Sequence, residues 1–277
     1  MKAAVDDPHS HTMGVMEHLR ELRKRLVYSA IIVTLGAIAA YYFSGDVFAF
    51  ISKPYIEGFG AAPLIGTSPA EAWLLKVKVA VFCGALVTSP ILFYQLWAFI
   101  APGLYQRERR WVIPCVVASS LLFIGGAAFC YFTVLPITLT FFRDEFTSIG
   151  VTPTIKIGEH VSMTLITMLG CGAVFEMPLL TFILARCGVI DRLFLLRWYR
   201  QAILGIFIIS AIITPPDVFS QILLSVPLLI LYAISVVIAL VAAPRKGDAK
   251  SADVEKPERF SADALIQDPP SPFQNLD

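Results

Sequence analysis

Long uncharged apolar runs constrain this chain more than any other feature of its sequence. Apolar residues make up 57% of the 277 residues and charged residues only 16%, whereas ordinary soluble domains have roughly 45–50% and about 25%. Crossing the hydrocarbon core of a bilayer takes about 20 consecutive apolar residues in a helix. The sequence therefore predicts an all-α integral membrane protein rather than a soluble globule.

Six runs are predicted to be transmembrane helices, at residues 26–43, 73–97, 111–135, 161–185, 198–213 and 218–241. A charged N-terminal segment, residues 1–25, precedes them, and a polar, proline-rich tail, residues 242–277, follows and is predicted to be disordered. The first run also has the charged start of a signal peptide. No A-x-A-like site with a polar domain behind it follows, so we expect it to remain as a span.

The fifth predicted span is short, because its 16 residues cover only about 24 Å of a core that is roughly 30 Å thick. We expect the bilayer to thin around it and around the sixth span. The segments 44–72 and 136–160 are predicted to be loops on one face of the membrane, with a short interfacial helix at residues 47–51, where aromatic side chains gather.

The distribution of lysine and arginine sets the expected orientation. Seventeen of the 22 basic residues lie in the two terminal segments and in the segments after the second and fourth spans, and three to five lie in the opposite loops. Cytoplasmic loops carry the excess of basic residues in membrane proteins. Both termini are therefore predicted to be cytoplasmic.

Several function classes find no support in the sequence. It contains no GxxxxGK[ST] phosphate loop and no HExxH zinc motif, so we expect neither an enzyme nor a bound metal or other cofactor. The five cysteines form no CxxC pair and are interpreted as small buried apolar residues. A formal net charge of +1 disfavours a nucleic-acid partner.

Two carboxylates stand out because they lie within basic segments on the predicted cytoplasmic face. Glu21 precedes the first span and is one helical turn from Arg25. Glu108 lies between the second and third spans, after the helix-breaking pair Pro102-Gly103. Each acid also fits a simpler role, at a solvated helix end or in a topology anchor. Together, two carboxylates on one face can hold paired guanidinium groups through bidentate hydrogen bonds.

A third carboxylate, Glu176, interrupts the fourth span just before Pro178. It precedes Arg186 by ten residues, which places it about 15 Å inside the predicted membrane boundary. An acid at that depth costs on the order of 2.5–3.5 kcal/mol on insertion scales. We expect this intramembrane polar residue to face a cavity or a partner.

Asp217 and Gln221 lie one turn apart at the outer start of the sixth span, so their side chains can share a face. Asp217 follows two prolines and precedes an apolar run, which is typical of a residue that caps a helix N-terminus. We predict that it caps the sixth span.

Five motifs follow one another along the chain. They are HLxELRxR at residues 18–25, SPxEAW at 68–73, WxFxxPGLYxxE at 97–108, FExP at 175–178 and TPPDxxSQ at 214–221. With these motifs the chain resembles TatC, the C subunit of the twin-arginine protein translocase, over residues 18–243. Trp73 stands where that family has Phe, a change of bulk that leaves the resemblance intact.

The resemblance implies a cup-shaped bundle of six transmembrane helices in the bacterial cytoplasmic membrane. It implies that Glu21 and Glu108 bind the consecutive arginines of the signal peptides of folded cargo proteins. Arg23, Tyr94 and Phe99 lie in the segments that contribute to this binding in the family.

The resemblance also implies partners. TatA-like and TatB-like single-span subunits are expected to dock near Asp217 and Gln221, with multiple copies in each complex and with the proton-motive force driving transport. Glu176 is expected to contact a partner helix or to thin the membrane. An alternative from the residues alone is a proton-coupled small-solute transporter that uses Glu176 as its protonatable group.

Overall fold

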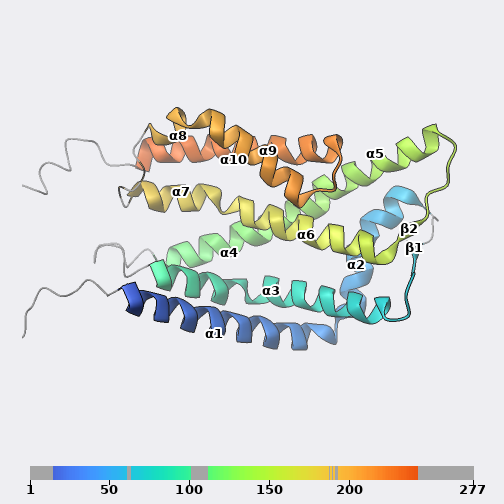
Figure 1. The fold of residues 1–277 in the computed structure, drawn as a ribbon, viewed down its shortest axis with the longest axis horizontal. Coiled ribbons are helices and arrows are strands. Elements are labelled where there is room, and N and C mark those ends of the chain that lie inside the picture. Colours follow the sequence, from blue (N-terminus) through green and yellow to red (C-terminus); the bar gives the residue numbers. More distant parts are fainter. Residues whose placement is uncertain are drawn as a thin grey trace, which may run out of the picture.

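The computed structural model describes residues 15–60, 64–100, 112–186, 188, 190 and 193–242. Most of these residues lie in helices that run along one long axis (Figure 1). The helices are α1 (Val15–Tyr41), α2 (Ser44–Phe59), α3 (Glu71–Ile100), α4 (Val112–Phe129), α5 (Leu135–Ser148), α6 (Ile157–Phe175), α7 (Met177–Arg186), α8 (Phe194–Arg197), α9 (Tyr199–Ile213) and α10 (Val218–Ala242). A π-helix, η3 (Cys130–Val134), joins α4 to α5, and the short strands β1 (Leu64–Ile65) and β2 (Ile155–Lys156) pair in parallel.

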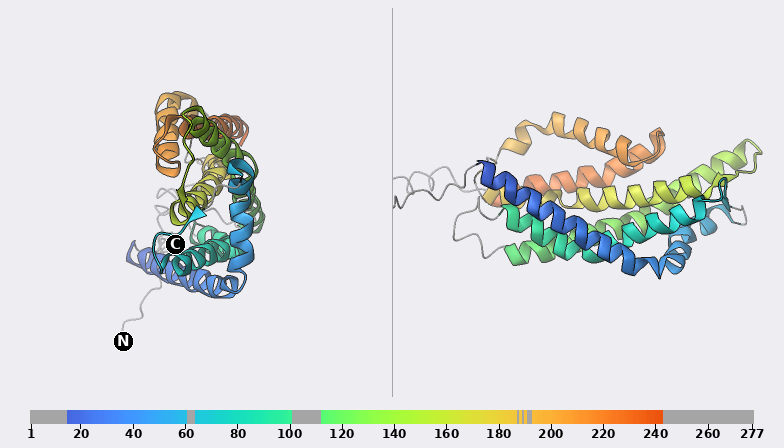
Figure 2. Two further views of the ribbon diagram at one scale, coloured as in Figure 1. Left: turned by 90° about the vertical axis from the view of Figure 1, so that its right-hand side faces the viewer. Right: turned by 60° about the horizontal axis from the view of Figure 1, so that its bottom comes forward.

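The helices follow an arc that opens to one side, which gives the six-span bundle its cup shape (Figure 2). The start of α1 and the end of α10 lie at the same end of the bundle (Figure 1). We call it the basic end, because α1 carries Arg20, Arg23, Lys24 and Arg25 in its first turns there. An even number of crossings brings the chain back to this end.

In the described part of the chain, five helical segments are long and apolar enough to cross a membrane, and α9 is a shorter apolar helix. Each predicted span falls on one of these six segments. α9 has 15 residues, which cover about 22 Å at about 1.5 Å per residue. That length is less than the roughly 30 Å of a typical hydrocarbon core.

The predicted loop at residues 136–160 is wrong over its first half. The helical segment that begins at Val112 continues through α4, η3 and α5 to Ser148, a length of 37 residues. Pro136 does not end it, because this proline lies in the first turn of α5, directly after η3. At such a position a missing backbone N–H is tolerated.

The other outer segment also contains more helix than predicted, since α2 extends over 16 residues. Ile51, Tyr55 and Phe59 are spaced four residues apart and are all buried, so tertiary packing of this stripe stabilises the longer helix. Pro54 has no N–H to donate to the carbonyl of Phe50 four residues earlier. The hydroxyl of Tyr131 in η3 donates to that oxygen instead, at 2.7 Å.

Glycines allow α1 and α3 to approach each other closely. A Cβ at Gly84 of α3 would lie 2.5 Å from the backbone nitrogen of Ala37, and one at Gly36 of α1 would lie 2.8 Å from Cγ2 of Thr88. Small residues at helix interfaces are the main route to close packing in a membrane, where no hydrophobic force holds helices together.

We expect Gly84→Ala to destabilise the protein by about 1–3 kcal/mol, because the new methyl group overlaps backbone that cannot rotate away. The measurement is thermal unfolding of the purified protein in detergent, followed by tryptophan fluorescence. Gly125→Ala is the matched control, since a Cβ at Gly125 meets nothing within 4 Å. Equal unfolding temperatures for the two variants would contradict the packing argument.

Candidate functional site

At the basic end, Glu21 lines a cleft between α1 and the last turns of α3. The cleft has a volume of about 470 Å³ and is lined by Glu17, Arg20, Glu21, Lys24, Arg25, Tyr28 and Gln95. Oε1 of Glu21 accepts hydrogen bonds from Nε and Nη2 of Arg25, at 3.0 and 2.5 Å. Nη1 of Arg25 donates to Oε1 of Gln95 at 3.2 Å. The expected pairing of Glu21 with Arg25 is thus present.

The second oxygen of Glu21 differs from the first. Oε2 is buried and accepts no hydrogen bond from any residue in the described ranges. A carboxylate oxygen withdrawn from water normally has a donor. Glu21 therefore retains one acceptor oxygen that Arg25 does not use.

The structure brings some of the other predicted site residues to this region. The ring of Phe99 stacks on that of His18, with centroids 4.3 Å apart, which ties the end of α3 to α1. Tyr94 on α3 is 50% exposed, and Arg23 is exposed on α1 outside the lining of the cleft. Glu108 lies outside the described residues, so its expected position beside Glu21 stays a prediction.

Inside the bundle, Glu176 occupies the turn that separates α6 from α7. Its backbone oxygen accepts from the N–H of Leu180 at 2.9 Å, so helical bonding resumes after the break. Its side chain is only 7% exposed. The carboxyl has a polar interaction with the side chain of Ser119, while its Oε1 has no partner among the described residues.

Trp97 holds Ser119 in place beside this carboxyl. Nε1 of Trp97 donates to Oγ of Ser119 at 2.9 Å, and both residues are buried. The neighbouring Ser120 donates its hydroxyl to the carbonyl of Val116 at 2.7 Å, as helical serines often do. Because Ser119 accepts from Trp97 and has no such backbone bond in the described structure, its proton can point at Glu176. Sequence reasoning singled out Glu176 but neither Trp97 nor Ser119 as its neighbours.

At the opposite end, Asp217 and Gln221 join α9 to α10. Oδ1 of Asp217 accepts from the backbone N–H of Ser220 at 2.7 Å, which confirms the predicted N-cap of α10. Nε2 of Gln221 donates to the backbone oxygen of Phe207 in α9 at 3.1 Å. The side-chain amide of Gln221, which was expected to help dock a partner helix, is therefore already hydrogen-bonded between α10 and α9.

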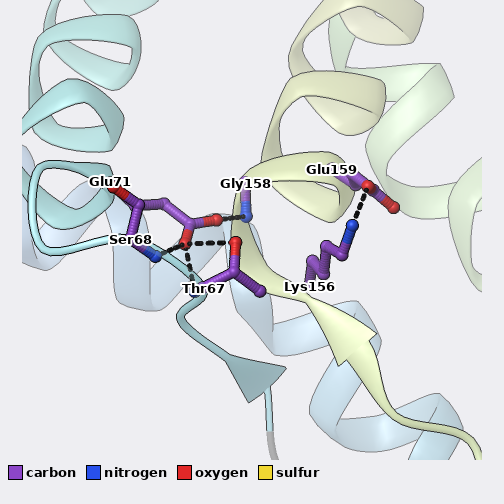
Figure 3. Close-up of polar contacts among 6 residues, drawn as sticks. All are labelled: Thr67, Ser68, Glu71, Lys156, Gly158 and Glu159. Atoms are coloured by element: carbon purple, nitrogen blue, oxygen red, sulfur yellow. Dashed lines mark hydrogen bonds and ion pairs between the residues drawn. The ribbon is translucent and has the colours of Figure 1, made fainter.

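Glu71 is a polar residue whose role sequence reasoning missed. Its Oε2 accepts from the backbone N–H groups of Thr67, at 2.5 Å, and Ser68, at 3.3 Å, and its Oε1 accepts from the N–H of Gly158 at 2.9 Å. One carboxylate thus connects the loop before α3 to the first turn of α6 (Figure 3). The paired strands β1 and β2 connect the same two segments.

A local signal for part of this arrangement was present in the sequence. Ser68 and Glu71 have the S-x-x-E spacing of a capping box, in which the acid reaches back to the N–H at the start of its own helix. The bond to Gly158 joins residues 87 positions apart. No local spacing rule predicts a contact of that separation.

The described residues contain no cluster of three or more side chains suited to hold a metal ion. Cys83, Cys115, Cys130 and Cys171 are free thiols. The fold and these sites define a multi-pass helical membrane protein. It has a cleft lined by Glu21 at its basic end and a buried carboxylate, Glu176, among its apolar helices.

Comparison with known proteins narrows the class to a family. Residues 17–227 match the family model described as "Sec-independent protein translocase protein (TatC)". The chain is 38% identical to the TatC protein of Aquifex aeolicus over 87% of this chain and 100% of that protein, and 36% identical to that of Koribacter versatilis over 84% and 87%. A solved structure described as "Crystal Structure of Twin Arginine Translocase Receptor- TatC" superposes with a TM-score of 0.75 at 39% identity, covering 82% of this chain and 99% of that one.

The chain therefore belongs to the TatC family of Sec-independent protein translocase proteins. It is a multi-pass membrane component of twin-arginine protein transport. Its relatives are named for a transport role rather than for catalysis.

We expect Glu71→Ala to loosen the end of the bundle opposite the basic end, because three backbone N–H groups lose their acceptor at once. Hydrogen exchange of peptides that cover residues 155–162 should become about tenfold faster or more. Glu57→Ala is the control, since Glu57 is exposed and pairs only with Lys53 in the described structure. Unchanged exchange at Gly158 in Glu71→Ala would argue against the role of Glu71 in joining these two segments.

Proposed function

We propose that this chain is the receptor subunit that binds paired-arginine signal peptides at its basic end. The observation that carries the proposal is that the two carboxylate oxygens of Glu21 differ. Oε1 is hydrogen-bonded to Arg25, whereas Oε2 has no donor in the described structure. We propose that a guanidinium group from a peptide bonds to Oε2 while Arg25 stays on Oε1. The solved relative is itself named a twin-arginine translocase receptor, which agrees with this role.

Arginine suits this cleft better than lysine. Its planar guanidinium presents donors in a fixed fork that matches a carboxylate, whereas an ammonium is a compact and strongly hydrated point charge. We propose that Glu108 supplies the second acid for the second arginine. Tyr94 and Phe99 add aromatic surface beside the cleft for the apolar part of the peptide. Arg23, on α1, also contributes to binding of the peptide.

The orientation of the chain in the membrane and its assembly with partners are proposed from the distribution of charge and from family membership. The basic end faces the cytoplasm of a bacterial cell, with both termini there, because basic residues gather on that side. TatA-like and TatB-like single-span subunits assemble with several copies of this chain. They dock at the α9–α10 hairpin near Asp217 and Gln221, and the proton-motive force drives transport without a cofactor.

Glu176 is proposed to receive a polar group from a partner helix within the membrane. Its Oε1 lacks a donor in the described structure, and the short α9 brings the nearby membrane boundary closer to it. Membership in a protein translocase family favours this role over proton-coupled transport of a small solute.

Glu21→Gln should weaken binding of an Arg-Arg signal peptide about tenfold or more, because a charge-assisted hydrogen bond contributes about 1.5–3 kcal/mol. The measurement is fluorescence anisotropy of a labelled peptide with the purified full chain, in parallel with its Lys-Lys counterpart. The variant should also lose its preference for arginine over lysine.

Glu145→Gln is the matched control for Glu21→Gln, because Glu145 is exposed on α5 at the opposite end of the bundle. It should bind like the unchanged protein. Equal binding of the two peptides by the unchanged protein would refute recognition of paired arginines.

Ser119→Ala should slow export about threefold to tenfold by removing the hydroxyl beside Glu176, while binding of the signal peptide changes less than twofold. In a Glu176→Gln background the same substitution should have a smaller effect, since only the loss of the acceptor for Trp97 remains. Ser120→Ala is the control, because its hydroxyl serves only its own helix in the described structure. Additive effects of Ser119→Ala and Glu176→Gln would show that Ser119 acts independently.

A further inference from the structure

A groove between α1 and α3 lies at the end of the bundle away from the basic end and takes no part in the function proposed above. Its volume is about 820 Å³, which falls within the roughly 300–1,000 Å³ of sites that hold a small molecule. Its walls are mostly apolar and include Val33, Ala37 and Ile38 of α1 with Ala80 and Val81 of α3. Such walls suit an acyl chain.

A single cation lies among the residues that line this groove. Lys76 is five residues into α3, and its side chain is exposed. The other lysines of the described chain all have a neighbour: Lys24 approaches the ring of Tyr28, Lys53 pairs with Glu57, Lys78 donates to Ser162 and Lys156 pairs with Glu159. For Lys76 the described structure gives no such partner, and no carboxylate lines the groove.

The corner between α1 and α2 closes the groove on the same side as Lys76. Tyr41 and Tyr42 line it, and Tyr42 is 85% exposed, as is common for aromatic side chains at a membrane boundary. Ser44 and Gly45 line it as well. They begin α2, where backbone N–H groups carry partial positive charge. Asp46, the acid in this first turn, is not among the lining residues.

We propose that this groove binds an anionic phospholipid, with its phosphate beside Lys76 and an acyl chain along the apolar wall between α1 and α3. The groove has a cation at one end and an apolar wall along the rest of its length. An amphiphile with a negatively charged head group matches both. A zwitterionic lipid would add a second ammonium near Lys76, and a purely apolar partner would leave that charge unmatched. Only 6% of the residues in the most apolar stretch of α1 are buried within the protein, so lipid has access to it.

The test is native mass spectrometry of the purified full chain, titrated in detergent with phosphatidylglycerol or with phosphatidylcholine of the same acyl chains. We expect phosphatidylglycerol to bind about fivefold more tightly, and Lys76→Gln to remove that preference. Lys78→Gln is the matched control, because Lys78 lies on the same helix two residues away but bonds to Ser162. It should change binding less than twofold.

A second variant tests the apolar wall. Thr34 is exposed and lines the groove, so Thr34→Phe should fill it without disturbing the interior and should weaken binding of both lipids. Binding of the Arg-Arg peptide should be unchanged in Lys76→Gln and Thr34→Phe, which separates this site from the signal-peptide cleft. Equal losses for Lys76→Gln and Lys78→Gln, equal binding of the two lipids by the unchanged protein, or no effect of Thr34→Phe would each overturn the proposal.

Discussion

Hydrocarbon offers a backbone no water to bond with, so a membrane protein must supply donors for its own carbonyls wherever a helix is interrupted or ends. This chain does so with side chains from neighbouring helices. The hydroxyl of Tyr131 bonds to the carbonyl that Pro54 leaves free, and Arg143 donates to the carbonyl of Gly58 near the end of α2. The hydroxyl of Thr167 is shared between the carbonyl of Met163 in its own helix, at 2.8 Å, and that of Ile213 at the end of α9, at 3.2 Å. These bonds allow the bundle to carry bends and short helices at one end.

The number of hydrogen bonds that each carboxylate accepts also distinguishes the acids by role. Glu71 accepts backbone hydrogen bonds on both of its oxygens, and its chemistry is complete within the fold. Glu21, Glu176 and Asp217 each have one oxygen withdrawn from water without a donor in the described chain. Leaving such a group unpaired is costly, and a ligand that supplies a donor recovers that cost. The binding sites proposed above are therefore at acids whose hydrogen bonding is incomplete in the described structure.

Sequence reasoning succeeded where structure depends on neighbours within one helical turn. The apolar runs predicted the long apolar helices, the spacing of Glu21 and Arg25 predicted their ion pair, and Asp217 caps α10 as its position indicated. It failed where tertiary contacts decide. The full length of α2, the continuation of α5 past Pro136 and the bond from Glu71 to Gly158 all depend on partners that lie far away along the chain.

The π-helix η3 has a geometric consequence for the long segment that contains it. A π turn holds one residue more than an α turn, and each residue of a helix turns its side chain by about 100°, so the faces before and after η3 are out of phase by about that angle. Before η3, Gly126 faces Gly172 of α6, and after it, Leu139 faces Gly58 of α2. The count of residues in η3 thus decides which neighbour each half of the segment meets. An insertion or deletion there changes this count, whereas a substitution leaves it unchanged.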